Sequence, residues 1–119
     1  MHPGFVIREV FLCRDPIDFR KGIAGLSALV EQEFRGDVFG EALYAFTNRR
    51  RDRMKILYWD RNGFCLWIKR LESDRFHWPD IKSLDATVSL SAEQLRWLLD
   101  GYDLWKQKPH QKLSYERVS

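Results

Sequence analysis

The sequence predicts an α+β fold: an antiparallel sheet of about four to six short strands, one long helix packed on a face, and a short capped C-terminal helix. Three observations predict it. Short runs of β-branched and aromatic residues alternate with turn residues through much of the chain. Apolar residues recur at helical spacing after Asp15, and a helix-capping pattern begins at Ser91.

The first two elements are a strand and the long helix. Residues 5–12 are dense in β-forming side chains and predict the strand. Asp15 and Pro16 suit a helix start, because Asp accepts hydrogen bonds from free amides and Pro fits the first helical position. Apolar residues spaced three or four apart extend this helix to about residues 35–36, and they form one stripe: Phe19, Ile23, Leu26, Val30 and Phe34.

The middle of the chain indicates three strands. Residues 43–47 and 54–59 are rich in β-formers and flank the charged residues 48–53, which we expect to form an exposed connection. Residues 60–63 predict a tight turn with Asn62 or Gly63 in the left-handed conformation, and residues 64–71 predict the partner strand.

Both faces of the expected hairpin are apolar. We assign Ile56, Tyr58, Phe64, Leu66 and Ile68 to one face, and Leu57, Trp59, Cys65 and Trp67 to the other. We expect the long helix to cover one face, while a second element or a partner covers the other.

The C-terminal third predicts short elements and a tail. Residues 75–78 and 87–90 are candidates for two more strands. Ser91 and Gln94 form a capping box for a helix, and Gly101 suits its C-terminal end. We therefore expect one domain over residues 1–105 and a flexible basic tail over residues 106–119.

Composition excludes several classes of protein. Hydrophobic residues make up 45% and charged residues 31%, which is typical of a globular chain rather than a disordered one. The sequence has no apolar run of membrane-spanning length and no signal-peptide core, so we expect a cytoplasmic protein. Cys13 and Cys65 form no CxxC pair, which argues against a disulfide framework or a structural zinc.

The sequence offers no catalytic constellation. His2, His77 and His110 are scattered without metal-ligand spacing, and Cys65 fits a small core residue better than a nucleophile. A glycine-rich phosphate loop is also missing from the sequence. We therefore predict a binding protein that is not an enzyme and that uses no metal and no cofactor.

Positive charge is concentrated in the middle of the chain. Residues 47–75 hold nine basic and four acidic residues, a net charge of +5, whereas the whole chain has +3. Guanidinium groups match phosphate oxygens in pairs, and clustered cations release counterions from a nucleic acid. The sequence therefore predicts a surface for nucleic-acid phosphates made of Arg49, Arg50, Arg51, Arg53, Lys55, Lys69 and Arg70. A solvated basic face without a partner is the alternative.

Three further residues are candidates for the same surface. Trp67 offers a ring for base stacking if Lys55 and a basic residue of the partner strand share its face, while a core position is the alternative. Arg20 and Lys21 oppose the dipole expected at a helix start, which favours a functional role. Their partner is either phosphate or an acidic neighbour such as Asp18.

Several runs of the sequence carry a family resemblance. They are DFRKGI at 18–23, FTNRRRDRMKILYWD at 46–60, GFCLW at 63–67, KRL at 69–71, FHWP at 76–79 and LSAEQLRWLLDG at 90–101. Together they resemble the TnpB accessory proteins of the IS66 family of bacterial insertion sequences, over about residues 5–105. The chain departs from the family pattern at Phe19, where that pattern has Met, and at Cys65.

The resemblance implies a role in DNA transposition beside a separate, larger transposase that carries the catalytic acids. It implies no relation to the RNA-guided nucleases that share the TnpB label. We expect a non-catalytic accessory protein that binds DNA at the ends of the element. The alternative is a protein-interaction module that docks on the transposase or another accessory protein, as the apolar hairpin faces and the acidic segment bearing Trp97 and Trp105 suggest.

Overall fold

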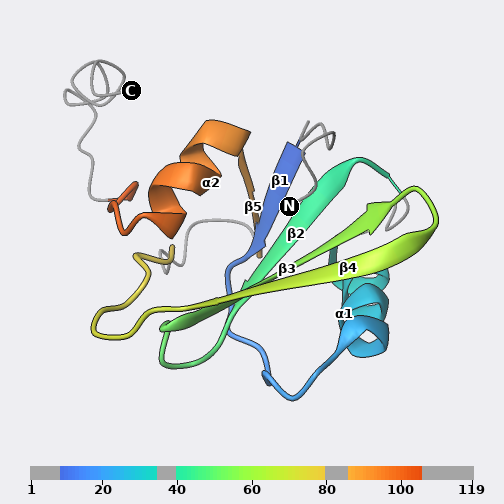
Figure 1. Cartoon of the computed structure of the whole chain (residues 1–119), viewed down its shortest axis with the longest axis horizontal. Coiled ribbons are helices and arrows are strands. Elements are labelled where there is room, and N and C mark those ends of the chain that lie inside the picture. The colour runs from blue at the N-terminus through green and yellow to red at the C-terminus, as the bar shows by residue number, and fades with distance from the viewer. Residues whose placement is uncertain (1–8, 35–39, 80–85, 106–119) are drawn as a thin grey trace.

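Five strands form one sheet with a helix on each face in the computed structural model, which describes residues 9–34, 40–79 and 86–105 (Figure 1). The sheet order is β4-β3-β2-β1-β5. The strands are β1 (Glu9–Cys13), β2 (Ala42–Thr47), β3 (Arg53–Asp60), β4 (Gly63–Arg70) and β5 (Thr87–Leu90). The helices are α1 (Ile23–Leu29), which continues as the π-helical turn η1 (Val30–Phe34), and α2 (Ala92–Leu99). The expected start of the first strand at 5–8, the expected helix end at 35–36 and the expected tail at 106–119 lie outside the described residues.

The sheet is mixed, so the prediction of an antiparallel sheet was wrong. Strand β1 pairs in parallel with β2, with Val10 opposite Leu43, while the other three pairings are antiparallel. The reason is the connection between β1 and β2, which contains α1. A helical crossover returns the chain to the edge from which it started, and parallel strands require such a crossover.

The long helix expected from residue 15 was also wrong, because α1 begins only at Ile23. Residues 16–22 instead run along the end of the sheet, where the amide of Ile17 donates to the carbonyl of Thr47 at 2.9 Å. Asp18 closes a local turn by accepting from the amide of Arg20 at 3.0 Å. These contacts take amides out of helical pairing, so tertiary structure overrides the apolar periodicity.

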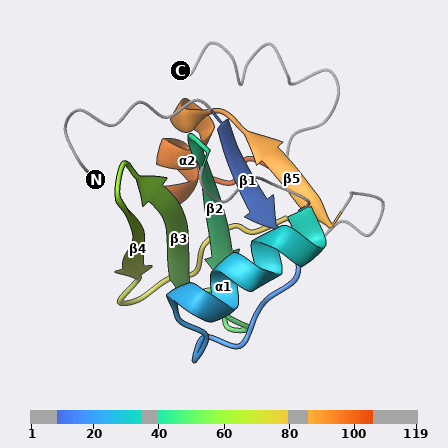
Figure 2. The ribbon, with the colours of Figure 1, turned by 90° about the vertical axis from the view of Figure 1, so that its right-hand side faces the viewer.

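One helix lies on each face of the sheet (Figure 2), and each face has its own core. On the α1 face, Leu26 and Val30 pack against buried side chains of β2 and β3, including Phe46. On the α2 face, Leu95 and Leu98 pack against a larger set: Val10, Leu12, Leu43, Ala45, Met54, Ile56 and Tyr58. On this face the hairpin side chains share one core with α2 and with the buried Phe76 and Trp78.

The hairpin faces differ from those expected. The register pairs Ile56 with Trp67 and Leu57 with Leu66, which interchanges the two sets of β4 side chains relative to the prediction. The reason is a two-residue connection, since Asp60 pairs with Gly63 and a shift of one residue moves every side chain of a strand to the other face. Arg61, rather than Asn62 or Gly63, takes the left-handed conformation with φ 54°.

The C-terminal third matches the sequence in its helix and differs before it. Residues 75–78 form no strand; instead Phe76 and Trp78 are buried in the α2-side core, and the indole of Trp78 donates to the carbonyl of Cys13 at 2.9 Å. The capping box of Ser91 and Gln94 is confirmed. No helix in the described ranges combines the length and apolar character needed to cross a membrane.

Candidate nucleic-acid interface

The connection between β2 and β3 is a tight turn organised by one side chain. The Asn48 carboxamide oxygen accepts from the amides of Asp52 and Arg53 at 3.2 and 3.1 Å, and its nitrogen donates to the Asp52 carboxylate at 2.6 Å. Arg51 takes the left-handed conformation with φ 61°. Because these bonds fix the backbone, the exposed side chains of Arg49 and Arg50 project from a defined turn.

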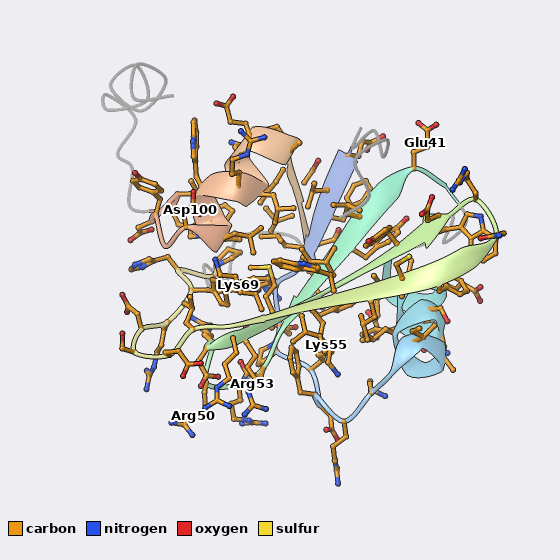
Figure 3. All side chains as sticks on the ribbon, viewed as in Figure 1. Glu41, Arg50, Arg53, Lys55, Lys69 and Asp100 are labelled. Atoms are coloured by element: carbon orange, nitrogen blue, oxygen red, sulfur yellow. The ribbon has the colours of Figure 1, made fainter. Side chains whose placement is uncertain are left out.

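A second segment brings another arginine to this turn. The amide of Leu71 donates to the carbonyl of Asp52 at 2.8 Å, so the chain beyond β4 lies against the turn. The strand register places Arg70 directly opposite Arg53, and both residues are exposed. Figure 3 shows Arg50 and Arg53 at the same end of the sheet. We call Arg49, Arg50, Arg53 and Arg70 the arginine edge.

A groove adjoins the arginine edge. It has a volume of about 450 Å³ and lies between residues 16–20 and the turn, with Arg20, Arg49 and Arg50 among its lining residues. Asp18 lines it as well, so the groove carries both signs of charge.

Arg20 and Lys21 precede α1 rather than occupying its first turn, so the helix-dipole argument does not apply to them. The Arg20 guanidinium donates to both carboxylate oxygens of Asp18, at 2.6 to 3.1 Å. This ion pair lowers the pKa of Asp18 below its ordinary value of 3.8. Arg20 nevertheless remains exposed at the groove, and Lys21 is exposed beside it.

Lys55 is committed to the interior of the protein. It is 8% exposed, and its ammonium donates to the carbonyls of Phe19 at 2.7 Å and Lys21 at 2.9 Å. The same ammonium lies 4.6 Å from the centre of the Phe19 ring. Burial lowers the pKa of Lys55 from its ordinary 10.5. Lys55 therefore fastens residues 16–22 to the sheet.

Lys69 and Trp67 lie on the α2 face, opposite the face of Lys55. The Lys69 ammonium donates to the carbonyl of Leu99 at 2.8 Å, which satisfies an end carbonyl of α2. Trp67 is partly buried against the α2-side core. The condition for a stacking platform is not met, because Lys55 and Trp67 do not share a face.

Three acidic residues lie in the turn and in the segment after β4, against the four residues of the arginine edge. Asp52 lies in the turn, and Glu72 and Asp74 are exposed in the segment that follows β4. The Asn48 hydrogen bond, followed by the charges of Arg50 and Arg53, lowers the pKa of Asp52. The carboxylate is therefore an integral part of the turn.

The structure thus divides the ten candidate residues. The arginines of the turn and Arg70 lie together at one end of the sheet. Arg20 and Lys21 lie beside the groove. Lys55 and Lys69 instead bind backbone carbonyls of the protein, and Trp67 packs against the α2-side core. The sequence reasoning missed the organising role of Asn48 with Asp52. The signal was an Asn and an Asp four residues apart in a connection, both of which favour side-chain-to-backbone bonds in turns.

No three His, Cys, Asp or Glu side chains within residues 9–34, 40–79 and 86–105 are placed to hold a metal ion.

Comparisons with known proteins give consistent results. The family model described as IS66 Orf2 like protein matches residues 8–109. The uncharacterized protein y4jC of Sinorhizobium fredii is 36% identical over 104 residues, which cover 85% of this chain and 86% of the relative. The uncharacterized protein y4hO of the same organism is 30% identical over 98 residues, covering 82% and 83%. No solved structure matches the chain.

Proposed function

This chain belongs to the family of IS66 Orf2-like proteins, and from that premise we propose that it is a non-catalytic accessory protein of transposition whose arginine edge binds DNA phosphates. Family membership supports the transposition role, because the family is defined by an insertion sequence. The DNA contact is supported by the geometry of the edge alone.

The observation that carries this proposal is that four exposed arginines lie on segments that meet at one end of the sheet. They come from the β2–β3 turn, from the start of β3 and from the end of β4. Each guanidinium presents a planar fork of donors that pairs with two phosphate oxygens. The Asn48 bonds fix the backbone of the turn, so binding orders few additional residues.

The proposal is tested by titrating the protein with duplex DNA that carries the ends of the element, over a series of salt concentrations. Each phosphate contact contributes about 0.9 to the slope of log K against log salt. We expect the variant with Arg49, Arg50, Arg53 and Arg70 all changed to Ala to lose several such contributions. Arg51 is left in place, because its left-handed backbone is part of the turn.

The matched control is Arg96→Ala, which removes an exposed arginine from the last turn of α2. This variant should keep the salt dependence and affinity of the unaltered protein. Absence of binding at low salt, or equal losses in both variants, would refute the DNA-binding proposal.

A second proposal is docking on the transposase or on another accessory protein of the element. Its support lies around the end of α2, where Tyr102 is 56% exposed and Trp97 and Trp105 are only partly buried. The test is co-purification with the transposase after nuclease treatment, with Tyr102→Ser as the variant. A complex that disappears once DNA is digested would contradict docking and would favour the arginine edge.

A further inference from the structure

The two edge strands of the sheet differ in how well they are protected. Strand β5 has four residues, whereas β4 has eight and no neighbouring strand on its outer side among the described residues. Monomeric proteins protect edges with short strands, prolines, bulges or charges. Residues 63–68 contain neither a charge nor a proline, and their register with β3 is continuous.

The β4 edge carries apolar side chains on both faces of the sheet. Phe64, Leu66 and Ile68 belong to the α1 face, while Cys65 and Trp67 belong to the α2 face. All five remain partly or largely exposed, and Ile68 is 55% exposed. The helices therefore leave apolar area uncovered at this edge on each side.

The backbone direction identifies which amides are available. The amide of Leu71 points inward, since it donates to Asp52 on the β3 side. Successive amides of a strand alternate in direction. The amides of Arg70, Ile68 and Leu66 therefore point away from β3, where a further strand would accept from them.

We propose that this edge binds a second copy of the chain, with β4 of each copy paired antiparallel about a two-fold axis at Leu66. Two-fold pairing keeps the α1 faces of both copies on one side of the joined sheet. Directly opposed residues must therefore be both even-numbered or both odd-numbered. The register centred on Leu66 then sets Phe64 against Ile68 of the partner subunit, and Cys65 against Trp67 of the partner subunit. Every pair between residues 64 and 68 is apolar on its own face, which stabilises adjacent strands.

The charges favour the antiparallel direction. Arg70 is exposed at one end of β4, whereas the Lys69 ammonium is bound to the carbonyl of Leu99. The turn at the other end holds Asp60 and Arg61 as an ion pair at 3.7 Å, so antiparallel pairing sets Arg70 beside a turn without net charge. Parallel pairing would oppose like charges at the same end, which is unfavourable. The self-pairing leaves Arg49, Arg50 and Arg53 outside the joined strands, while Arg70 lies at the end of the contact.

The first test measures the molar mass of the purified, nuclease-treated protein by size-exclusion chromatography with light scattering. We expect twice the 14.3 kDa of the single chain. Ile68→Glu should shift the mass toward one chain, because it places a carboxylate against Phe64 of the partner subunit. Within its own chain the position is 55% exposed and opposite Lys55, so the new carboxylate has solvent and a cation beside it, and urea unfolding checks that the variant is folded.

Ile23→Glu is the matched control, because Ile23 is also a large exposed apolar residue, at 40%, but lies at the start of α1. This variant should keep the mass of two chains. A single-chain mass for the unaltered protein, or a dimer that survives Ile68→Glu, would overturn the proposal.

A second test does not depend on weakening the dimer. Directly opposed residues in an antiparallel pair have Cα atoms about 4.5–5.5 Å apart, within the range that a disulfide spans. In a Cys65→Ser background, Leu66→Cys should therefore give a covalent dimer on mild oxidation. Ser89→Cys on the exposed side of β5 is the control and should remain monomeric under denaturing conditions. Equal cross-linking in both variants would contradict the proposed register.

Discussion

Lysine and arginine have different roles in this molecule. Lys55 and Lys69 each donate to backbone carbonyls at 2.7 to 2.9 Å, and each joins two segments distant in the sequence. The side chains of Arg49, Arg50 and Arg53 remain exposed. A compact ammonium on a long apolar stem suits buried backbone contacts, whereas a planar guanidinium suits phosphate. In this account, Lys55 and Lys69 therefore stabilise the fold, whereas the arginines form the interface.

Lys55→Met tests this separation. The change leaves the carbonyls of Phe19 and Lys21 without their donor, and we expect a loss of about 1–3 kcal/mol in the free energy of unfolding. The salt dependence of DNA binding should keep its slope, because Lys55 contacts no phosphate in this account. Urea unfolding and the salt titration measure the two quantities. Lys21→Met is the control for stability, because this change keeps the Lys21 carbonyl that accepts from Lys55.

The reverse pattern would contradict the assignment of Lys55. If Lys55→Met kept its stability and reduced the salt slope by about one, the ammonium would be a phosphate ligand after all.

Cys13 predicts a dependence of stability on alkaline pH. Burial, followed by the charge of Asp15, raises the pKa of the thiol from 9.0 to about 11. A raised pKa means that the folded state keeps its proton longer than the unfolded state, so stability falls as the pH rises through this interval. We expect wild type to lose about 2 kcal/mol relative to Cys13→Ala between pH 9.0 and about 11.

The measurement is urea unfolding of both proteins under reducing conditions at several pH values. Comparing the two proteins cancels the titration of the other groups. A constant difference across the interval would show that the thiol ionises equally in both states.

At the scale of elements, residues adjacent in the sequence were sufficient to predict some helices and strands and insufficient to predict others. The capping box at Ser91 and the strands 42–47, 53–60 and 63–70 follow from residues adjacent in the sequence. The start of α1 does not, because Lys55, 34 residues away, and Thr47 determine the path of residues 16–22. The parallel pairing of β1 and β2 depends on how the crossover packs, which periodicity alone does not specify.

The capping box provides a prediction at this scale. Ser91→Ala removes the acceptor of the Gln94 amide, a bond of 3.1 Å, and should cost about 1 kcal/mol of stability. Thermal or urea unfolding measures this loss. Ser89→Ala in the preceding strand is exposed and should stay within about 0.5 kcal/mol of wild type. Equal losses of stability in the two variants would indicate that the capping hydrogen bond of Ser91 contributes no stability of its own.

At the scale of the whole molecule, charge is distributed by position in the fold. The sequence showed a basic block between residues 47 and 75, but not which of its cations share a surface. Folding places the turn arginines and Arg70 at one end of the sheet, while Lys55 and Lys69 lie on opposite faces (Figure 3). This division required the hairpin register, and the register depended on a two-residue turn in which Arg61 is left-handed.

The account makes a whole-molecule prediction about where DNA contacts the protein, and arginine footprinting tests it most directly. Guanidinium groups are modified chemically with and without duplex DNA, and the extent of modification at each arginine is read by mass spectrometry. We predict that DNA protects Arg49, Arg50, Arg53 and Arg70, while Arg96 on α2 reacts as before. Protection centred on Arg96, or unchanged reactivity at all five arginines in a sample shown to contain bound DNA, would contradict the arginine edge as the interface.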